Sequence, residues 1–247
     1  MSGVRPKLYE TKGKVKSGVK ENQHRTALVG FIYRTLPIWR DDPKRPDANR
    51  ETTLSETLCG MLSIRAKKEI PNFHFIHEAA ATGRRSVDIA VKPDDECVLD
   101  ARTYTKYETV LAIECKRLPA PTRDREREYV SGDDNITGGI QRFKLSEHGA
   151  GLPVAVMVGY IQRETAQIWL EKINGWLVEM AGSKTGDGLL WESGEKLGDF
   201  RYDGEAATAC AISSHPRISG TPRLHEQPIK IRHLWVEMSR RGAVPIS

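Results

Sequence analysis

The sequence contains no stretch that approaches the roughly 20 consecutive apolar residues that a membrane-spanning helix needs. Its first residues, MSGVRPKLYETKGKVK, are basic but lack the apolar stretch of a secretory signal. We therefore expect a cytoplasmic protein without a membrane segment.

Cysteines are few, and no two of them form a CxxC pair. No group of cysteines and histidines has the spacing of a zinc site. His74 and His77 come nearest, but residues three apart in a strand face opposite sides of it. We expect reduced, mostly buried thiols at the cysteine positions, which are Cys59, Cys97, Cys115 and Cys210.

The chain also lacks a P-loop and a recognisable second domain. Its 247 residues, 38% hydrophobic and 29% charged, suit one soluble domain. The net charge of +5 belongs entirely to residues 1–20, which carry six basic and one acidic side chain. We expect a flexible basic arm over 1–22, either a phosphate-binding segment or a solvated tail, and one domain over 23–247.

Apolar periodicity predicts four helices and six strands, with a proline-containing loop over 37–49. The predicted helices cover residues 24–36, 51–68, 137–147 and 162–181. The predicted strands cover residues 73–80, 86–93, 107–118 and 152–161, and segments near 207–213 and 228–238 add two at the end. A mixed sheet with helices on both sides accommodates this order, so the expected fold class is α/β.

Charged side chains interrupt two of the predicted strands. Alternation places Glu114 and Lys116 on one face of the apolar strand over 107–118. In the strand over 86–93, Asp88 lies on the face opposite the β-branched residues. If the two strands are hairpin neighbours, Asp88 reaches the same side as Glu114. A buried structural ion pair is the other explanation for such a cluster, although buried pairs seldom add much stability.

Such a set of side chains suits phosphodiester hydrolysis. Two carboxylates that converge on one point form a site for a hard divalent cation such as Mg²⁺. The cation polarises the phosphate and lowers the pKa of a bound water. Lys116 supplies a fixed positive charge that stabilises the developing negative charge or orients the attacking water.

The segments SVDIAV and LAIECK, separated by a long gap, resemble the motif of the PD-(D/E)xK nuclease superfamily, with Val87 in place of the motif's proline. The resemblance spans about residues 50–161 and extends to the order of the elements, helix, three strands, helix and strand. It implies a restriction-endonuclease-like core, a central mixed β-sheet flanked by helices. It also implies catalytic roles for Asp88, Glu114 and Lys116, with Asp88 and Glu114 binding Mg²⁺ or Mn²⁺.

The same resemblance implies two auxiliary residues. A glutamate on the first core helix often helps to bind metal in this superfamily. Glu56 is the first choice for this role by position, and Glu51 and Glu78 are rivals. Gln141, in GGIQRFK, matches a position on the helix after the third strand and is expected to orient the water or contact phosphate.

Four basic residues near these positions are candidates for nucleic-acid contact, with a solvated surface as the alternative explanation. They are Arg84, Arg85, Arg142 and Lys144. Together these features predict a metal-dependent endonuclease that acts on DNA, with RNA as the alternative substrate, and the resemblance implies a setting in bacterial restriction or anti-phage defence. It would work as a homodimer or with a partner protein. The alternative is a nucleic-acid-binding subunit that does not cut, or that cuts only with a partner.

Overall fold

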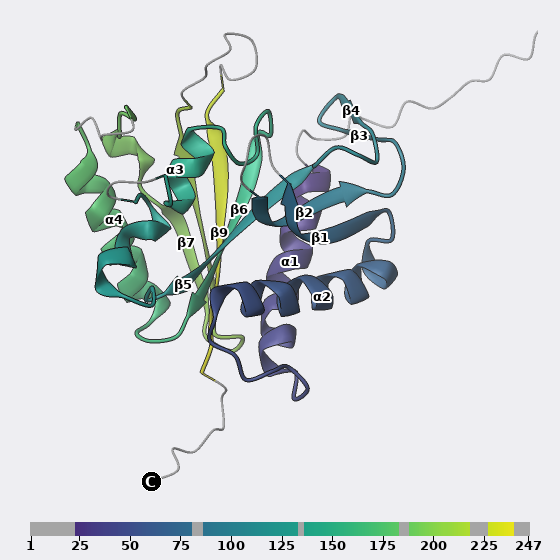
Figure 1. Cartoon of the computed structure of the whole chain (residues 1–247), viewed down its shortest axis with the longest axis horizontal. Coiled ribbons are helices and arrows are strands. Elements are labelled where there is room, and N and C mark those ends of the chain that lie inside the picture. Colours follow the sequence, from purple (N-terminus) through teal and green to yellow (C-terminus); the bar gives the residue numbers. More distant parts are fainter. Residues whose placement is uncertain (1–22, 81–85, 133–135, 183–187, 218–226, 240–247) are drawn as a thin grey trace, which may run out of the picture.

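The computed structural model describes residues 23–80, 86–132, 136–182, 188–217 and 227–239, which are built around a seven-stranded sheet (Figure 1). In spatial order the strands are β1 (Phe73–Ala80), β2 (Ser86–Pro93), β5 (Leu111–Leu118), β6 (Val154–Ile161), β9 (Ile229–Glu237), β8 (Thr208–His215) and β7 (Gly198–Asp203). The three central strands, β5, β6 and β9, run parallel, and the outer strands pair antiparallel. The predicted mixed sheet of an α/β fold is confirmed.

Helices cover both faces of this sheet (Figure 1). On one face lie α1 (Gln23–Asp41) and α2 (Glu51–Glu69). On the other lie α3 (Gly139–Lys144), α4 (Ala166–Met180), and the short 3₁₀ helices η1 (Arg123–Tyr129) and η2 (Ser193–Glu195). Two adjacent residues of β6 show which helices pack on each face of the sheet. Tyr160 stacks on Trp39 of α1, whereas Gly159 pairs with Trp235, whose ring contacts Tyr129 of η1.

The loop predicted to begin at Pro37 is wrong, because α1 continues through the proline to Asp41. Tertiary contacts in the last turn explain this. Trp39 is 1% exposed, and its indole nitrogen donates a hydrogen bond to Thr57 in α2. Burial of so large a side chain offsets the backbone hydrogen bond that a proline removes.

Three strands were not predicted. Two of them, β3 (Cys97–Leu99) and β4 (Arg102–Tyr104), form a small separate hairpin. The third is β7, whose sequence GDFRYD has no apolar alternation. It pairs only with β8 and is exposed along almost its whole length, so no buried face imposed a pattern on it. All four cysteines are free thiols, as expected.

A chain of buried polar side chains crosses the face that carries α3. It begins where Lys144 of α3 contacts both carboxylate oxygens of Glu195, at 2.5 and 2.6 Å. Burial raises the pKa of Glu195, but His215 and Lys144 outweigh burial and hold it below its usual value. Glu195 is therefore ionised, and the Nδ1–H of His215, 2.5 Å away, donates to it.

Because Glu195 is ionised, the donor and the acceptor of every further hydrogen bond in this chain are fixed. Burial lowers the pKa of His215, so this ring is neutral and its bare Nε2 accepts from the hydroxyl of Ser213 at 2.6 Å. Ser213 must in turn accept from Nε2–H of His233 at 2.7 Å. His233 is also neutral, so its Nδ1 accepts from Tyr129, whose oxygen accepts from the Trp235 indole. One directed chain thus joins α3, η1 and η2 to β8 and β9.

Gly159 makes room for the last member of this chain. A Cβ at residue 159 would lie 2.4 Å from Cδ1 of Trp235, closer than such atoms approach. We expect Gly159→Ala to displace the indole and to lower the free energy of unfolding by about 1–3 kcal/mol. Urea unfolding followed by fluorescence measures the change.

Gly175→Ala is the matched control for this substitution. Residue 175 lies in α4, and an added Cβ there meets nothing within 4 Å. Alanine should stabilise the protein there by up to about 1 kcal/mol through its helix propensity. Equal effects at the two positions would contradict the steric argument.

Candidate active site

Pairing of β2 with β5 brings the three motif residues together. Ile89 lies opposite Ile113, so the neighbouring residues Asp88 and Glu114 project from the same face of the sheet. Asp88 also reaches across the ladder, where its Oδ2 accepts a hydrogen bond from the backbone N–H of Cys115 at 2.7 Å. Lys116 shares the face because it lies two residues beyond Glu114.

Glu114 is completely buried and lies beside two cations and a histidine. Its Oε1 lies 3.1 Å from Nζ of Lys116 and 2.7 Å from Nη1 of Arg142, and its Oε2 lies 3.0 Å from Nδ1 of His148. Burial alone raises the pKa of Glu114, but Lys116, His148 and Arg142 together outweigh it and lower the pKa to about 2. Glu114 is therefore a carboxylate at any physiological pH.

The surroundings of Asp88 shift its pKa in the opposite direction from that of Glu114. Burial, followed by the negative charge of Glu114, raises the pKa of Asp88 to about 7, although Lys116 and the Cys115 amide act against the rise. Because a raised carboxyl pKa records negative charge without enough compensation, the site around Asp88 favours an additional cation.

Lys116 connects these carboxylates to α2. Its Nζ lies 3.3 Å from Oε1 of Glu51, the first residue of that helix, and the other oxygen of Glu51 accepts the backbone N–H of Arg117 at 2.9 Å. Burial lowers the pKa of Lys116, but Glu114, Glu51 and Asp88 outweigh burial and hold it above its ordinary value. Lys116 is thus a fixed positive charge at neutral pH and has no lone pair with which to remove a proton.

These residues border a polar cavity of about 410 Å³. The side chains that line it come from α2, β2, β5, η1, α3 and the segment leading into α3, namely Glu51, Ser86, Asp88, Lys116, Arg125, Glu128, Thr137 and Arg142. Glu114 is not among them. It lies behind Lys116 and Arg142, the two cations that both line the cavity and contact Glu114.

The structure brings Glu51, rather than Glu56, to this cavity. Glu56 is exposed on α2, one and a half turns further along the helix, and Glu78 is exposed on β1. Neither contributes to the lining of the cavity. The glutamate predicted to come from the first core helix is therefore best assigned to Glu51, one of the two rival candidates.

Gln141 lies next to the cavity but faces a loop. Its side-chain oxygen accepts hydrogen bonds from the backbone N–H groups of Gly132 and Gly138, both at 3.0 Å. These contacts fix the turn that leads into α3. Gln141 is 2% exposed and does not line the cavity, so the predicted contact with water or phosphate has no direct support from its position.

Of the four basic residues predicted to contact nucleic acid, Arg142 lies in the cavity wall. The expectation for Lys144 needs correction, because this side chain is 1% exposed and contacts Glu195. Its burial removes it from any phosphate in solvent. Arg84, Arg85 and the expected arm over 1–22 lie outside the described residues.

Sequence reasoning missed the contact between His148 and Glu114. His148 is fully buried and reaches the carboxylate from beyond α3. A histidine a few residues after a short helix carries no pattern of its own. Only the return of the chain between α3 and β6 places its ring against β5.

No family model, curated protein or solved structure matches this chain. None of the helices in the described residues is both long and apolar enough to cross a membrane. Across the same residues, no three metal-ligating side chains form a ready-made metal centre. The function must therefore be argued from the geometry and charge of the site itself.

Proposed function

We propose that this protein is a metal-dependent nuclease of restriction-endonuclease-like architecture that hydrolyses phosphodiester bonds in DNA. The observation that carries the proposal is the convergence of Asp88, Glu114 and Lys116 on one face of β2 and β5, next to a polar cavity. Burying two carboxylates and an ammonium in one sheet costs free energy, so their convergence indicates a functional site.

The carboxylates suit a hard divalent cation in their chemistry. Asp88 and Glu51 present oxygen atoms to the cavity, and Asp88 has the raised pKa of a carboxylate that lacks a cation. Asp88 and Glu114 would hold Mg²⁺ or Mn²⁺, with support from Glu51. Such a cation supplies a water of lowered pKa and polarises the phosphate. Before Glu114 could bind the cation, Arg142 would have to move away from Oε1 of Glu114.

The cations of the site would act on the phosphate. Lys116 is held protonated by its carboxylate neighbours, so its role is to donate hydrogen bonds and to stabilise negative charge in the transition state. Arg142, once separated from Glu114, presents a planar group that matches two phosphate oxygens. Arg125, which also lines the cavity, would meet the neighbouring phosphate of the strand.

DNA as the substrate, and a role in bacterial restriction or anti-phage defence, rest on the resemblance of the motif. The positive charge concentrated in residues 1–20 supports a nucleic-acid substrate, since basic side chains bind the phosphate backbone regardless of sequence. RNA remains a second substrate for the same chemistry. A homodimer, or a complex with a partner protein, would supply the second site needed to cut both strands.

One observation favours a different function, a nucleic-acid-binding subunit that does not cut alone. Glu114 already contacts two cations and the ring of His148, and Arg142 and Lys116 separate it from the cavity. In this second proposal the ion pairs are a permanent part of the structure. A partner chain would then either open the site or supply the catalysis.

Cleavage of supercoiled plasmid, linear duplex, single-stranded DNA and RNA would test the first proposal, with Mg²⁺, Mn²⁺ or EDTA and with Asp88→Asn alongside the wild type. We expect cleavage that requires the metal and falls at least about a hundredfold in the variant. Glu56→Gln is the control and should keep full activity, because Glu56 is exposed away from the cavity.

Failure to cleave any substrate with either metal would overturn the first proposal for the isolated chain. Metal binding measured by calorimetry then separates the two proposals. Binding that disappears in Asp88→Asn keeps the metal site and leaves a missing partner as the explanation. Absence of both cleavage and metal binding leaves the non-catalytic subunit.

A further inference from the structure

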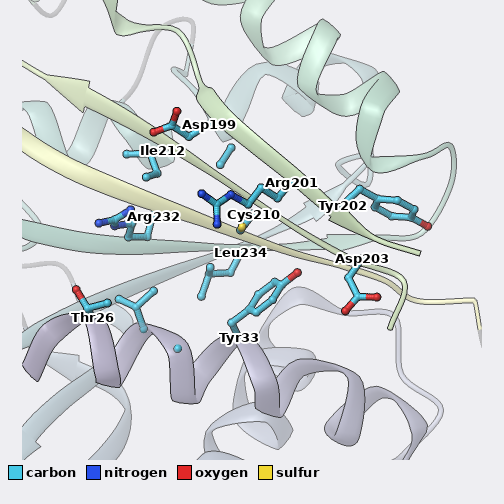
Figure 2. Close-up of a pocket in the computed structure, with 13 residues that line it drawn as sticks. Thr26, Tyr33, Asp199, Arg201, Tyr202, Asp203, Cys210, Ile212, Arg232 and Leu234 are labelled. Atoms are coloured by element: carbon cyan, nitrogen blue, oxygen red, sulfur yellow. The ribbon is translucent and has the colours of Figure 1, made fainter. Parts of the chain in front are cut away.

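A second cavity lies on the opposite face of the sheet, between α1 and the outer strands β7, β8 and β9 (Figure 2). Its volume is about 480 Å³, within the range of pockets that hold small molecules. Of the helices that the structure describes, α1 is the one that lines this pocket. None of its lining residues belongs to the candidate active site.

The walls of this pocket are mainly apolar. Val29 of α1, Ile212 of β8 and Leu234 of β9 line it, and Tyr33 of α1 lines the pocket beside them. Gly30 deepens the pocket because it has no side chain, and a Cβ there would meet only the mobile end of Arg34, at 3.3 Å. The space therefore suits an apolar or aromatic body.

Two arginines give the pocket its charge. In the ladder, Arg201 pairs with Cys210, and Arg232 pairs with Ile212, so both guanidinium groups emerge from the same face (Figure 2). Burial raises the pKa of the Cys210 thiol, and the charges of Arg201 and Arg232 act against that rise.

Neither of these arginines has an ion pair with a carboxylate in the described part of the chain, although Arg25, Arg40 and Arg142 all do. Two like charges near each other are unfavourable unless an anion lies between them.

The acidic residues of the pocket do not supply that anion. Asp203 lies at the far end beside Tyr33, and its Oδ1 accepts the backbone N–H groups of Glu205 and Ala206 in the turn after β7 (Figure 2). Asp199 lies at the upper edge of the pocket in Figure 2 and makes no ion pair with either arginine among the described residues. Within the part of the chain that the structure describes, no carboxylate is therefore paired with the arginine end of the pocket.

We propose that this pocket binds a small molecule that joins one anionic group, a carboxylate or a phosphate, to an apolar or aromatic body. Arg201 and Arg232 hold the anion, since guanidinium groups match both kinds of oxygen pair. The body lies along α1 against Val29, Leu234 and Tyr33. This pocket is independent of the nuclease chemistry and would exist equally in a subunit that does not cut.

Calorimetric titration of the full chain in EDTA tests this assignment, with two matched pairs of probes. The first pair is adenosine monophosphate and adenosine, and the second is hexanoate and hexanol. We expect at least one anion to bind tenfold or more tightly than its neutral partner. The phosphate or the carboxylate source is then identified by which pair shows the difference, and both pairs showing it supports the shared chemistry.

Variants locate the binding. Gly30→Leu fills the pocket and should abolish binding, and Arg201→Gln combined with Arg232→Gln should weaken it at least tenfold. Arg163→Gln, at an exposed arginine outside the pocket, should leave the affinity unchanged. Equal binding of anionic and neutral probes, or no binding at all, overturns the proposal. So does binding that survives Gly30→Leu but is lost in Lys116→Met, because the ligand would then lie in the other cavity.

Discussion

Substitution of Lys116 by methionine is expected to lower the rate of DNA cleavage at least about a hundredfold, the loss typical of removing one group that stabilises transition-state charge. Methionine keeps much of the volume of the lysine stem but removes the charge. The ammonium that lies between Glu51 and Glu114 is then absent. Single-turnover cleavage of a labelled duplex under saturating Mg²⁺ measures the chemical step directly.

Lys230→Met is the matched control for this variant, since Lys230 is an exposed lysine of the sheet on β9. Circular dichroism of both variants establishes that each is folded. Should folded Lys116→Met cleave as fast as the wild type, Lys116 would be part of the ion-pair network only. The proposed mechanism would then lack the positive group that stabilises charge in the transition state.

The second large effect is expected on stability. Lys144→Met should lower the free energy of unfolding by about 3–5 kcal/mol, because it leaves Glu195 buried without its cation. Lys144 also lies 4.5 Å from the centre of the Trp191 ring, so its removal costs packing as well. Urea denaturation followed by circular dichroism measures the change.

Lys172→Met provides a close comparison. Lys172 also lies over a tryptophan, 4.7 Å from the centre of the Trp169 ring, and also contacts carboxylates, those of Glu126 and Glu164. It is 36% exposed, so its loss should cost no more than about 1 kcal/mol. Adding Glu195→Gln to Lys144→Met should recover part of the stability, and failure to do so would show that the buried charge is not the cause.

The central residues of the site could be predicted from the sequence, because successive side chains of a strand point to opposite faces of the sheet. Asp88, Glu114 and Lys116 had to share a face once β2 and β5 were neighbours. The choice between Glu51 and Glu56 could not be predicted in this way. Both lie on α2, and which of them meets β5 depends on how far the helix slides along the sheet, a distance that helical periodicity leaves open.

Arg142 and Lys144 illustrate a second limit. The two look alike in the sequence, yet residues two apart on a helix point in nearly opposite directions. Arg142 reaches Glu114, and Lys144 reaches Glu195 in η2, more than 40 residues later in the chain. No local pattern marks η2 or the exposed edge strand β7, because neither has a long apolar face.

The buried chain behind α3 has one more consequence. Ser213, His215 and Glu195 have the contacts of a serine hydrolase triad, with Oγ 2.6 Å from Nε2 and Nδ1 2.5 Å from the carboxylate. Ser213, however, is 3% exposed, and its oxygen also accepts a hydrogen bond from Nε2–H of His233. A hydroxyl that is held in this way and closed to solvent cannot attack an ester. In this protein the same three types of side chain instead hold the sheet and the helices that cover it together.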